Sequence, residues 1–195
     1  IQMTTECSID TVAFGGEGVA RLNNLAVFVP FTLPGEIVDI EILVKKPRFA
    51  RAVSKSIKLE SPNRTIPPCP HFFTCGGCQL QHSSYEYQLE IKRKFIQDAL
   101  ERIGKINLDV PPVVPSSKPF GYRRHISLKI RKVKGIFTLG FRSNHNAHLT
   151  INTCLLLGEK DSTTDLLSSL QTLIQSLDPE GPFEESTLKI HYLDT

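Results

Sequence analysis

Long apolar runs are missing from this 195-residue sequence. No run approaches the ~20 residues that a membrane-spanning helix needs, and the start has no signal-peptide pattern. We therefore expect no membrane partner. With 40% apolar and 22% charged residues, the composition is that of a globular protein that buries a core in one or two domains.

Acidic residues are absent between Asp109 and Glu159, a stretch that contains eight basic ones. These are Lys118, Arg123, Arg124, Lys129, Arg131, Lys132, Lys134 and Arg142. A second basic run, from Lys45 to Arg64, is opposed only by Glu60. Segregated positive charge favours a polyanionic partner. The alternative for each run is a solvated surface, on which the two signs are usually interspersed.

The cysteine count, which is five and therefore odd, and the clustering of three of the cysteines argue against a secreted disulfide framework. We expect a reducing, cytoplasmic location. Cys69, Cys75 and Cys78 form a C-x5-C-x2-C pattern in which Gly76 and Gly77 permit a tight turn with amides directed at thiolate charge. Three clustered thiols favour zinc or an iron–sulfur cluster.

Either group needs a fourth ligand, for which Cys154 is the candidate. It lies in an apolar run, where a lone cysteine is as often a small buried side chain as a ligand. His82 is nearer to the cysteine loop, but we expect it to hydrogen-bond with the loop and not to bind the metal.

The first sixty residues predict a small antiparallel barrel. Segments typical of strands run over residues 7–14, 26–31 and 38–44, and a last one begins at residues 51–53. Val38, Ile40, Ile42 and Val44 alternate with other residues, as in a half-buried strand. Glycines within 15–18 and the pair Pro34-Gly35 separate these segments. Residues 61–68 carry three prolines and read as a stiff linker.

Residues 69–195 predict a second domain with antiparallel strands and two amphipathic helices. The first helix opens at the capping box Ser83-x-x-Glu86 and stops at Gly104, with an apolar stripe at Tyr85, Leu89, Ile96, Leu100 and Ile103. The second opens at Ser162-x-x-Asp165, carries Leu166, Leu167, Leu170, Leu173, Ile174 and Leu177, and ends at residues 178–182. Strands are expected at 126–130, 136–141 and 188–192.

The motif C-P-x-F-x-x-C-G-G-C-x-x-Q-H at residues 69–82 resembles the cluster loop of the TRAM-domain, iron–sulfur RNA uracil-5 methyltransferases of the 23S rRNA type. These enzymes use S-adenosylmethionine to make 5-methyluridine. Residues 15–21, 27–30 and 33–36 resemble TRAM landmarks, residues 120–124 a Tyr-Arg segment of the family, and residues 151–156 the segment with its fourth cluster cysteine.

The resemblance implies an α+β protein: an OB-like TRAM barrel at 1–60, a linker at 61–68 and an α/β iron–sulfur domain at 69–195. It implies a 4Fe–4S cluster bound by Cys69, Cys75, Cys78 and Cys154. It also implies that S-adenosylmethionine and the catalytic residues belong to a later domain. No Gly-rich strand-to-helix turn of the required type occurs here, so we expect an N-terminal portion that is inactive alone.

The expected substrate is RNA, ribosomal in preference to transfer RNA, with no DNA partner and a monomeric protein. The candidate RNA contacts are Lys45, Lys46, Arg48, Phe49, Arg51, Arg123, Arg124, Lys129 and Arg131. Phe49 could stack on a base or belong to the barrel core. Two other functions stay open: a non-enzymatic RNA-binding protein with a structural four-cysteine zinc site, and redox chemistry at the cluster.

Overall fold

The computed structural model describes residues 4–177 and 185–191. The chain divides into two compact units: unit 1 comprises residues 1–68 and 79–115, and unit 2 comprises residues 69–78 and 116–195. Together they have a mixed α+β fold. In the described part of the chain, no helix combines the length and apolar character needed to cross a membrane.

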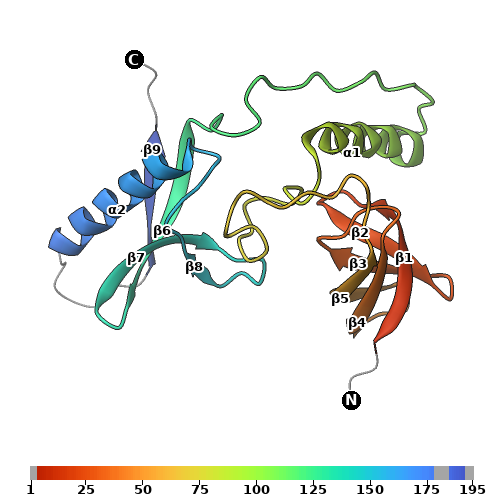
Figure 1. Ribbon diagram of the computed structural model, residues 1–195, viewed down its shortest axis with the longest axis horizontal. Helices are drawn as coiled ribbons and strands as arrows, with labels where there is room; N and C mark the ends of the chain where they lie inside the picture. The colour runs from red at the N-terminus through yellow and green to blue at the C-terminus, as the bar shows by residue number, and fades with distance from the viewer. Residues whose placement is uncertain (1–3, 178–184, 192–195) are drawn as a thin grey trace. The chain divides into compact units, whose positions relative to one another are not determined.

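Unit 1 contains a closed barrel with the strand order β1-β2-β3-β5-β4 (Figure 1). Its strands are β1 (Thr5–Val12), β2 (Glu17–Leu22), β3 (Leu25–Pro30), β4 (Ile37–Lys45) and β5 (Phe49–Leu59). Alternate residues of these strands point inward and form a core of small aliphatic side chains, among them Ile9, Val27, Val29, Val38 and Ile40. The predicted barrel over residues 1–60 is therefore confirmed, although β2 was not foreseen as a separate strand.

One pairing of the barrel differs from the antiparallel expectation. Residues 26–28 of β3 run parallel to residues 49–51 of β5, whereas the other four pairings are antiparallel. A closed ring with an odd number of strands cannot alternate direction at every neighbour. Closure with five strands therefore requires at least one parallel pair.

The alternation predicted along β4 holds only for its first half. Val38 and Ile40 are buried, but Ile42 and Val44 are exposed, and Glu41 is buried in their place. The register between β4 and β5 shifts between Asp39 and Ile40, just before this change, and again between Ile42 and Val44. The strict alternation of a regular strand is lost where the register shifts, and the apolar residues at the end of β4 lie on the surface.

The first helix, α1 (Tyr85–Asp98), continues as a π-helical segment, η1 (Ala99–Gly104). Its N-cap is Ser84, whose hydroxyl accepts a hydrogen bond from the Tyr87 amide, one residue later than predicted. The predicted apolar stripe was wrong, because Ile96 and Ile103 are exposed. The side chains that pack are Tyr87, Ile91 and Phe95, which are spaced four residues apart and meet Val12 and Leu33 of the barrel unit.

This helix therefore belongs to unit 1, although the sequence had grouped it with the cysteine loop in residues 69–195. The predicted linker also begins as part of unit 1. The Ser84 amide donates to the Asn63 carbonyl at 2.9 Å, and the Thr65 amide donates to the His82 carbonyl at 3.0 Å. These hydrogen bonds hold the chain after β5 beside the chain before α1.

Unit 2 contains a four-stranded antiparallel sheet with the order β8-β7-β6-β9 (Figure 1). Its strands are β6 (His125–Val133), β7 (Ile136–Arg142), β8 (His148–Thr150) and β9 (Glu185–His191). The hairpin predicted at Gly135 is confirmed by the β6–β7 pairing. β8 was not predicted, and it is too short to give an alternating pattern.

The second helix, α2 (Lys160–Leu177), covers the apolar face of this sheet. Leu167, Leu170 and Ile174 pack in the core that contains Ile126 and Leu128 of β6. Leu173 and Leu177, which belonged to the predicted stripe, are exposed. The predicted helix end at residues 178–182 lies outside the described residues, as does Tyr192 of the predicted last strand.

Candidate functional site

The cysteine loop at residues 69–78 is fixed to the end of β7. The Gly76 amide donates to the Arg142 carbonyl at 3.1 Å, and the Asn144 amide donates to the Thr74 carbonyl at 3.0 Å. A Cβ atom on Gly76 would meet the Arg142 oxygen at 3.0 Å, so glycine permits this close approach. Phe72, within the loop, is almost completely buried. The loop is thus anchored by backbone contacts and one aromatic side chain.

Cys154 is buried in unit 2, the unit that also contains the cysteine loop. Burial raises the pKa of its thiol, and negative charge at Cys69 and Cys75 raises it further. Hydrogen bonds from the Leu156 and Leu157 amides act in the opposite direction on this pKa. The sequence-distant cysteine is therefore close enough to Cys69 and Cys75 for their charges to interact.

Within the loop, burial raises the pKa of the Cys75 thiol, and the charge of Cys69 adds to this effect. The Gly77 amide donates to Cys75 Sγ at 3.4 Å and partly offsets the increase. Cys78 packs against the apolar cluster that contains Cys154. All five cysteines of the chain are free thiols.

This arrangement fits a group that binds thiolates. Thiols with a raised pKa, as at Cys75 and Cys154, are poor anions until a soft cation compensates their charge, and amides directed at sulfur favour the thiolate form. In residues 4–177 and 185–191, however, no three His, Cys, Asp or Glu side chains are grouped so as to hold one metal ion. The 4Fe–4S cluster stays a prediction.

The predicted RNA contacts of the barrel lie around the β4–β5 turn. The side chains of Lys45 and Arg48 are exposed. The Lys46 ammonium is 5.6 Å from the centre of the Phe49 ring, which is half-buried and meets Phe28 edge-to-face at 5.9 Å. Phe49 is thus a surface aromatic residue outside the buried core cluster of the barrel.

Arg51, the last predicted contact of this group, is already engaged. Its Nη1 atom donates to Glu17 Oε1 at 2.6 Å, and its guanidinium carbon is 5.7 Å from the centre of the Phe28 ring. Phe28 was missed by the sequence analysis. Its position in an alternating strand gave no sign that it pairs with Phe49 on the surface.

The predicted contacts on β6 are, like Arg51, already close to a carboxylate. Lys129 and Arg131 both approach Glu185 of β9, at 3.3 and 3.8 Å, and Arg142 approaches the same carboxylate at 3.3 Å. Its hydrogen bond with Lys129 and the nearby cations lower the pKa of Glu185. Arg123 and Arg124 lie outside this ion-pair group, in the segment that enters β6.

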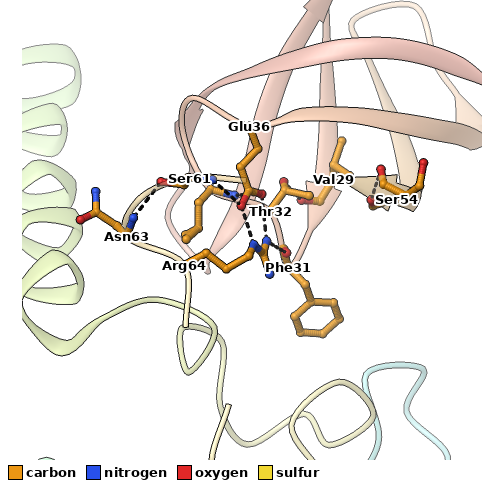
Figure 2. Close-up of polar contacts among 10 residues, drawn as sticks. Val29, Phe31, Thr32, Glu36, Ser54, Ser61, Asn63 and Arg64 are labelled. Carbon is orange, nitrogen blue, oxygen red and sulfur yellow. Dashed lines mark hydrogen bonds and ion pairs between the residues drawn. The ribbon is translucent and has the colours of Figure 1, made fainter. Parts of the chain in front are cut away.

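A buried ion pair that the sequence analysis missed lies in unit 1 (Figure 2). Glu36 is fully buried, and its carboxylate accepts hydrogen bonds from Arg64, from the Leu33 amide and from the Ser61 amide. Burial opposes ionisation, but these donors, Arg64 first, lower the pKa of Glu36 overall. The only sequence signal was a charged residue directly after the Pro34-Gly35 turn.

His82 is fully buried in the same region, with its ring 6.3 Å from that of Phe31. Burial and the positive charge of Arg64 lower the pKa of His82 to about 4, although the nearby Thr32 carbonyl and the charge of Glu36 act in the opposite direction. His82 therefore contributes to the packing of unit 1, as a neutral ring at pH 7.

Comparisons with known proteins relate the barrel to a domain family and most of the chain to RNA methyltransferases. The TRAM domain family matches residues 4–54, which cover most of the barrel. An uncharacterized RNA methyltransferase of Listeria monocytogenes is 33% identical over 190 residues, which cover 94% of this chain and 40% of that protein. The 23S rRNA (uracil(1939)-C(5))-methyltransferase RlmD of Francisella tularensis subsp. novicida is 35% identical, covering 86% of this chain and 39% of the relative.

A solved structure, the tRNA (uracil-54, C5)-methyltransferase of Pyrococcus abyssi with S-adenosyl-L-homocysteine, is 28% identical with a TM-score of 0.59. The match covers 88% of this chain and 37% of that one. This chain thus spans about two fifths of the length of its relatives. Residues 4–54 thus belong to the TRAM domain family, and most of the chain is similar to a part of proteins named RNA methyltransferases, among them two named for the C5 position of uracil.

Proposed function

We propose that this chain is the RNA-recognition half of an S-adenosylmethionine-dependent RNA (uracil-C5) methyltransferase. The observation that carries the proposal is the match of relatives named RNA methyltransferases to 94% and 86% of this chain, over about two fifths of their own length. In the full-length protein, the remaining part binds S-adenosylmethionine and performs methyl transfer, while this part binds and orients the RNA.

The barrel surface around the β4–β5 turn supports the RNA-binding role. Lys45, Lys46 and Arg48 present positive charge beside an aromatic pair, Phe28 and Phe49. Cations bind phosphates without regard to sequence, and an exposed ring offers a surface on which a base can stack. We therefore propose that this surface contacts the RNA backbone first and a base second.

A 4Fe–4S cluster bound by Cys69, Cys75, Cys78 and Cys154 is part of the proposal. The interacting thiols and the amide donors at Cys75 and Cys154 support it. Such a cluster would supply a covalent cross-link between the cysteine loop and the chain at Cys154, which is separated from Cys78 by 75 residues. Methyl transfer to uracil needs no electron, so we assign the cluster a structural role.

We propose ribosomal RNA as the substrate in preference to transfer RNA, and a monomeric, cytoplasmic enzyme. The choice of ribosomal RNA is supported by the relative named for 23S rRNA, which is 35% identical to this chain, compared with 28% for the solved structure named for a tRNA. The test is incubation of the full-length protein with 23S rRNA or tRNA and radiolabelled S-adenosylmethionine. We expect labelled 5-methyluridine in the rRNA digest. Label in tRNA alone would reverse the substrate assignment, and label in neither RNA would refute the proposed function.

A further inference from the structure

A groove in unit 2 lies where the chain enters β6. It is lined by residues 122–127 together with Phe141 of β7 and has a volume of about 780 Å³. This volume is within the usual range for sites that hold small organic groups. Among the described residues that line the groove, none is acidic, and two are arginines.

We propose that this groove binds one unstacked nucleotide of single-stranded RNA, with the base against the Tyr122 ring and the phosphate at Arg123. The inference rests on the proposed RNA-binding function and specifies where, in unit 2, the RNA is bound. It adds Tyr122 and Phe141 to the predicted contacts, which in the segment that enters β6 had included only Arg123 and Arg124.

Tyr122 has the properties of a stacking residue. Its side chain is 53% exposed at the groove. Among the described residues its ring has no aromatic partner and its hydroxyl has no hydrogen-bond partner. A half-exposed ring can offer a face to a ligand, and aromatic faces are the usual platforms for splayed-out bases.

Arg123 provides the charge beside that ring. Its side chain makes no ion pair or hydrogen bond within the described part of the chain. The acidic residue of β9, Glu185, pairs with Arg131, whereas the groove lies near the other end of β6, where His125 pairs with His191. Arg123 is therefore available for a phosphate, in contrast to the cations that approach Glu185.

The lining of the groove combines apolar and polar side chains. Ile126 is buried, and Phe141 is half-buried against the core of the sheet, whereas Ser127 and His125 are exposed. Such a mixed lining suits a nucleobase, whose faces are hydrophobic and whose edges form hydrogen bonds. A base in a double helix is stacked on both faces, so only an unstacked nucleotide could use the Tyr122 ring.

The backbone holds this site in position before RNA arrives. The Gly121 and Arg123 amides donate to the Leu155 and Leu156 carbonyls, each at 2.9 Å. Gly121 has a φ of +66°, and a Cβ atom there would lie 3.5 Å from the Gly158 Cα atom. The residues that flank Tyr122 are thus fixed to the turn that follows Cys154, which lowers the cost of ordering the site on binding.

The test measures binding of a short fluorescein-labelled single-stranded RNA to the 195-residue chain over a range of salt concentrations. We expect Tyr122→Ala to weaken binding by about 5- to 150-fold, since stacking on one base is worth about 1–3 kcal/mol. Tyr122→Phe, which keeps the ring, should bind like the wild type. Arg123→Ala should reduce the salt slope by ~0.7, whereas Lys160→Ala, an exposed cation of unit 2 outside the groove, should bind like the wild type.

A second measurement needs no variant. RNA that contains 4-thiouridine is cross-linked to the wild-type chain by light, and the attached peptide is identified by mass spectrometry. We expect attachment within residues 120–127. Unchanged affinity of Tyr122→Ala and Arg123→Ala, or cross-links only outside this segment, would overturn the groove assignment. The proposed function would survive either result if the wild type binds RNA and the full-length protein methylates it.

Discussion

The Arg64 guanidinium reaches the fully buried carboxylate of Glu36, with Nη2 at 2.8 Å from Oε2 (Figure 2). The same nitrogen donates to the Phe31 carbonyl at 2.9 Å. Arg64 follows β5, and Glu36 precedes β4, so the pair joins the barrel to the chain that leaves it. A charge in this position is tolerated because several donors compensate it.

Arg64→Ala should therefore destabilise unit 1 strongly. Removal of one partner of a buried ion pair leaves the other charge uncompensated, and the cost is about 3–5 kcal/mol. Urea denaturation followed by circular dichroism measures the change. Lys58→Ala is the matched control, because Lys58 pairs with Glu6 and Asp39 on the barrel surface and should matter little. Equal stabilities of the two variants would contradict the role of the buried pair.

His82 should make unit 1 sensitive to mild acid. Its pKa in the folded protein is about 4, below its ordinary value of 6.5, so the unfolded chain binds a proton first as the pH falls. The contribution of neutral His82 to the free energy of unfolding is therefore fully present above pH 6.5, and it is lost as the pH falls from 6.5 to about 4. The loss over this window is on the order of 3 kcal/mol.

The lowered pKa of Glu36 extends this acid sensitivity. Its contribution is complete above the ordinary carboxyl value of 4.5 and is lost as the pH falls through the lower folded value. Unfolding free energies measured between pH 4.5 and 7 separate the two groups. His82→Gln should flatten the curve in this window, and an unchanged curve in that variant would show that another group is responsible.

The barrel could be predicted from the sequence because its signals are local. Turn signals at 15–18 and at Pro34-Gly35 separate the expected strands, and β1, β3 and β4 begin and end within a few residues of their expected bounds, whereas β2 was missed. The register shifts in β4 and the parallel β3–β5 pair could not be predicted, because both depend on how the strands close into a ring.

In the candidate site, the cysteines could be predicted from local sequence, whereas the ion pairs of the cations could not. The cysteines have a spacing that implies their chemistry, and the structure places Cys154 near Cys69 and Cys75. The cations have no such signature. Arg51, Lys129 and Arg131 read as free charge in the sequence, but Glu17 and Glu185 approach them from distant strands. Such pairings arise from tertiary structure and leave no local pattern.

The four cysteines assigned to the cluster can be tested by metal analysis. Protein purified without oxygen should be brown and contain iron and acid-labile sulfide. Cys154→Ser should lower the iron content and the thermal midpoint. Loss of a cross-link that closes a long loop costs about 2–5 kcal/mol for a disulfide, and metal sites are comparable or stronger.

Cys7→Ala is the control for this measurement. Cys7 is in the barrel core of unit 1, so its removal should leave the iron content unchanged. Stoichiometric zinc without sulfide would favour the structural four-cysteine zinc site in place of the cluster. An unchanged midpoint and iron content in Cys154→Ser would show that Cys154 is not a ligand.

RNA binding by the barrel should depend on salt. Lys45→Ala, Lys46→Ala and Arg48→Ala should each reduce the slope of log affinity against log salt by ~0.7–0.9, one lost phosphate contact apiece. Phe49→Ala should cost about 1–3 kcal/mol of binding free energy if the ring stacks on a base. Lys58→Ala, whose ammonium is ion-paired, serves as the control. Unchanged slopes in all three lysine and arginine variants would place the RNA elsewhere.

The last prediction concerns catalysis by the 195-residue chain alone, which should bind RNA and methylate nothing. Carbon 5 of uracil becomes nucleophilic only after a group such as a thiolate adds at carbon 6. With four cysteines assigned to the cluster, Cys7 is the remaining thiol. It is buried in the barrel core, and burial, followed by the charges of Asp10, Asp39 and Glu6, raises its pKa. Cys7 therefore stays protonated at pH 7 and inaccessible to a base.

The measurement is incubation of this chain with RNA and radiolabelled S-adenosylmethionine, with the full-length protein as the positive control. We expect no label in the RNA from the 195-residue chain and label from the full-length protein. Cys7→Ala should leave RNA affinity unchanged, because the thiol is buried in the barrel core. Label incorporation by the short chain that disappears in Cys7→Ala would show that Cys7 is the nucleophile and that recognition and chemistry are not divided as proposed.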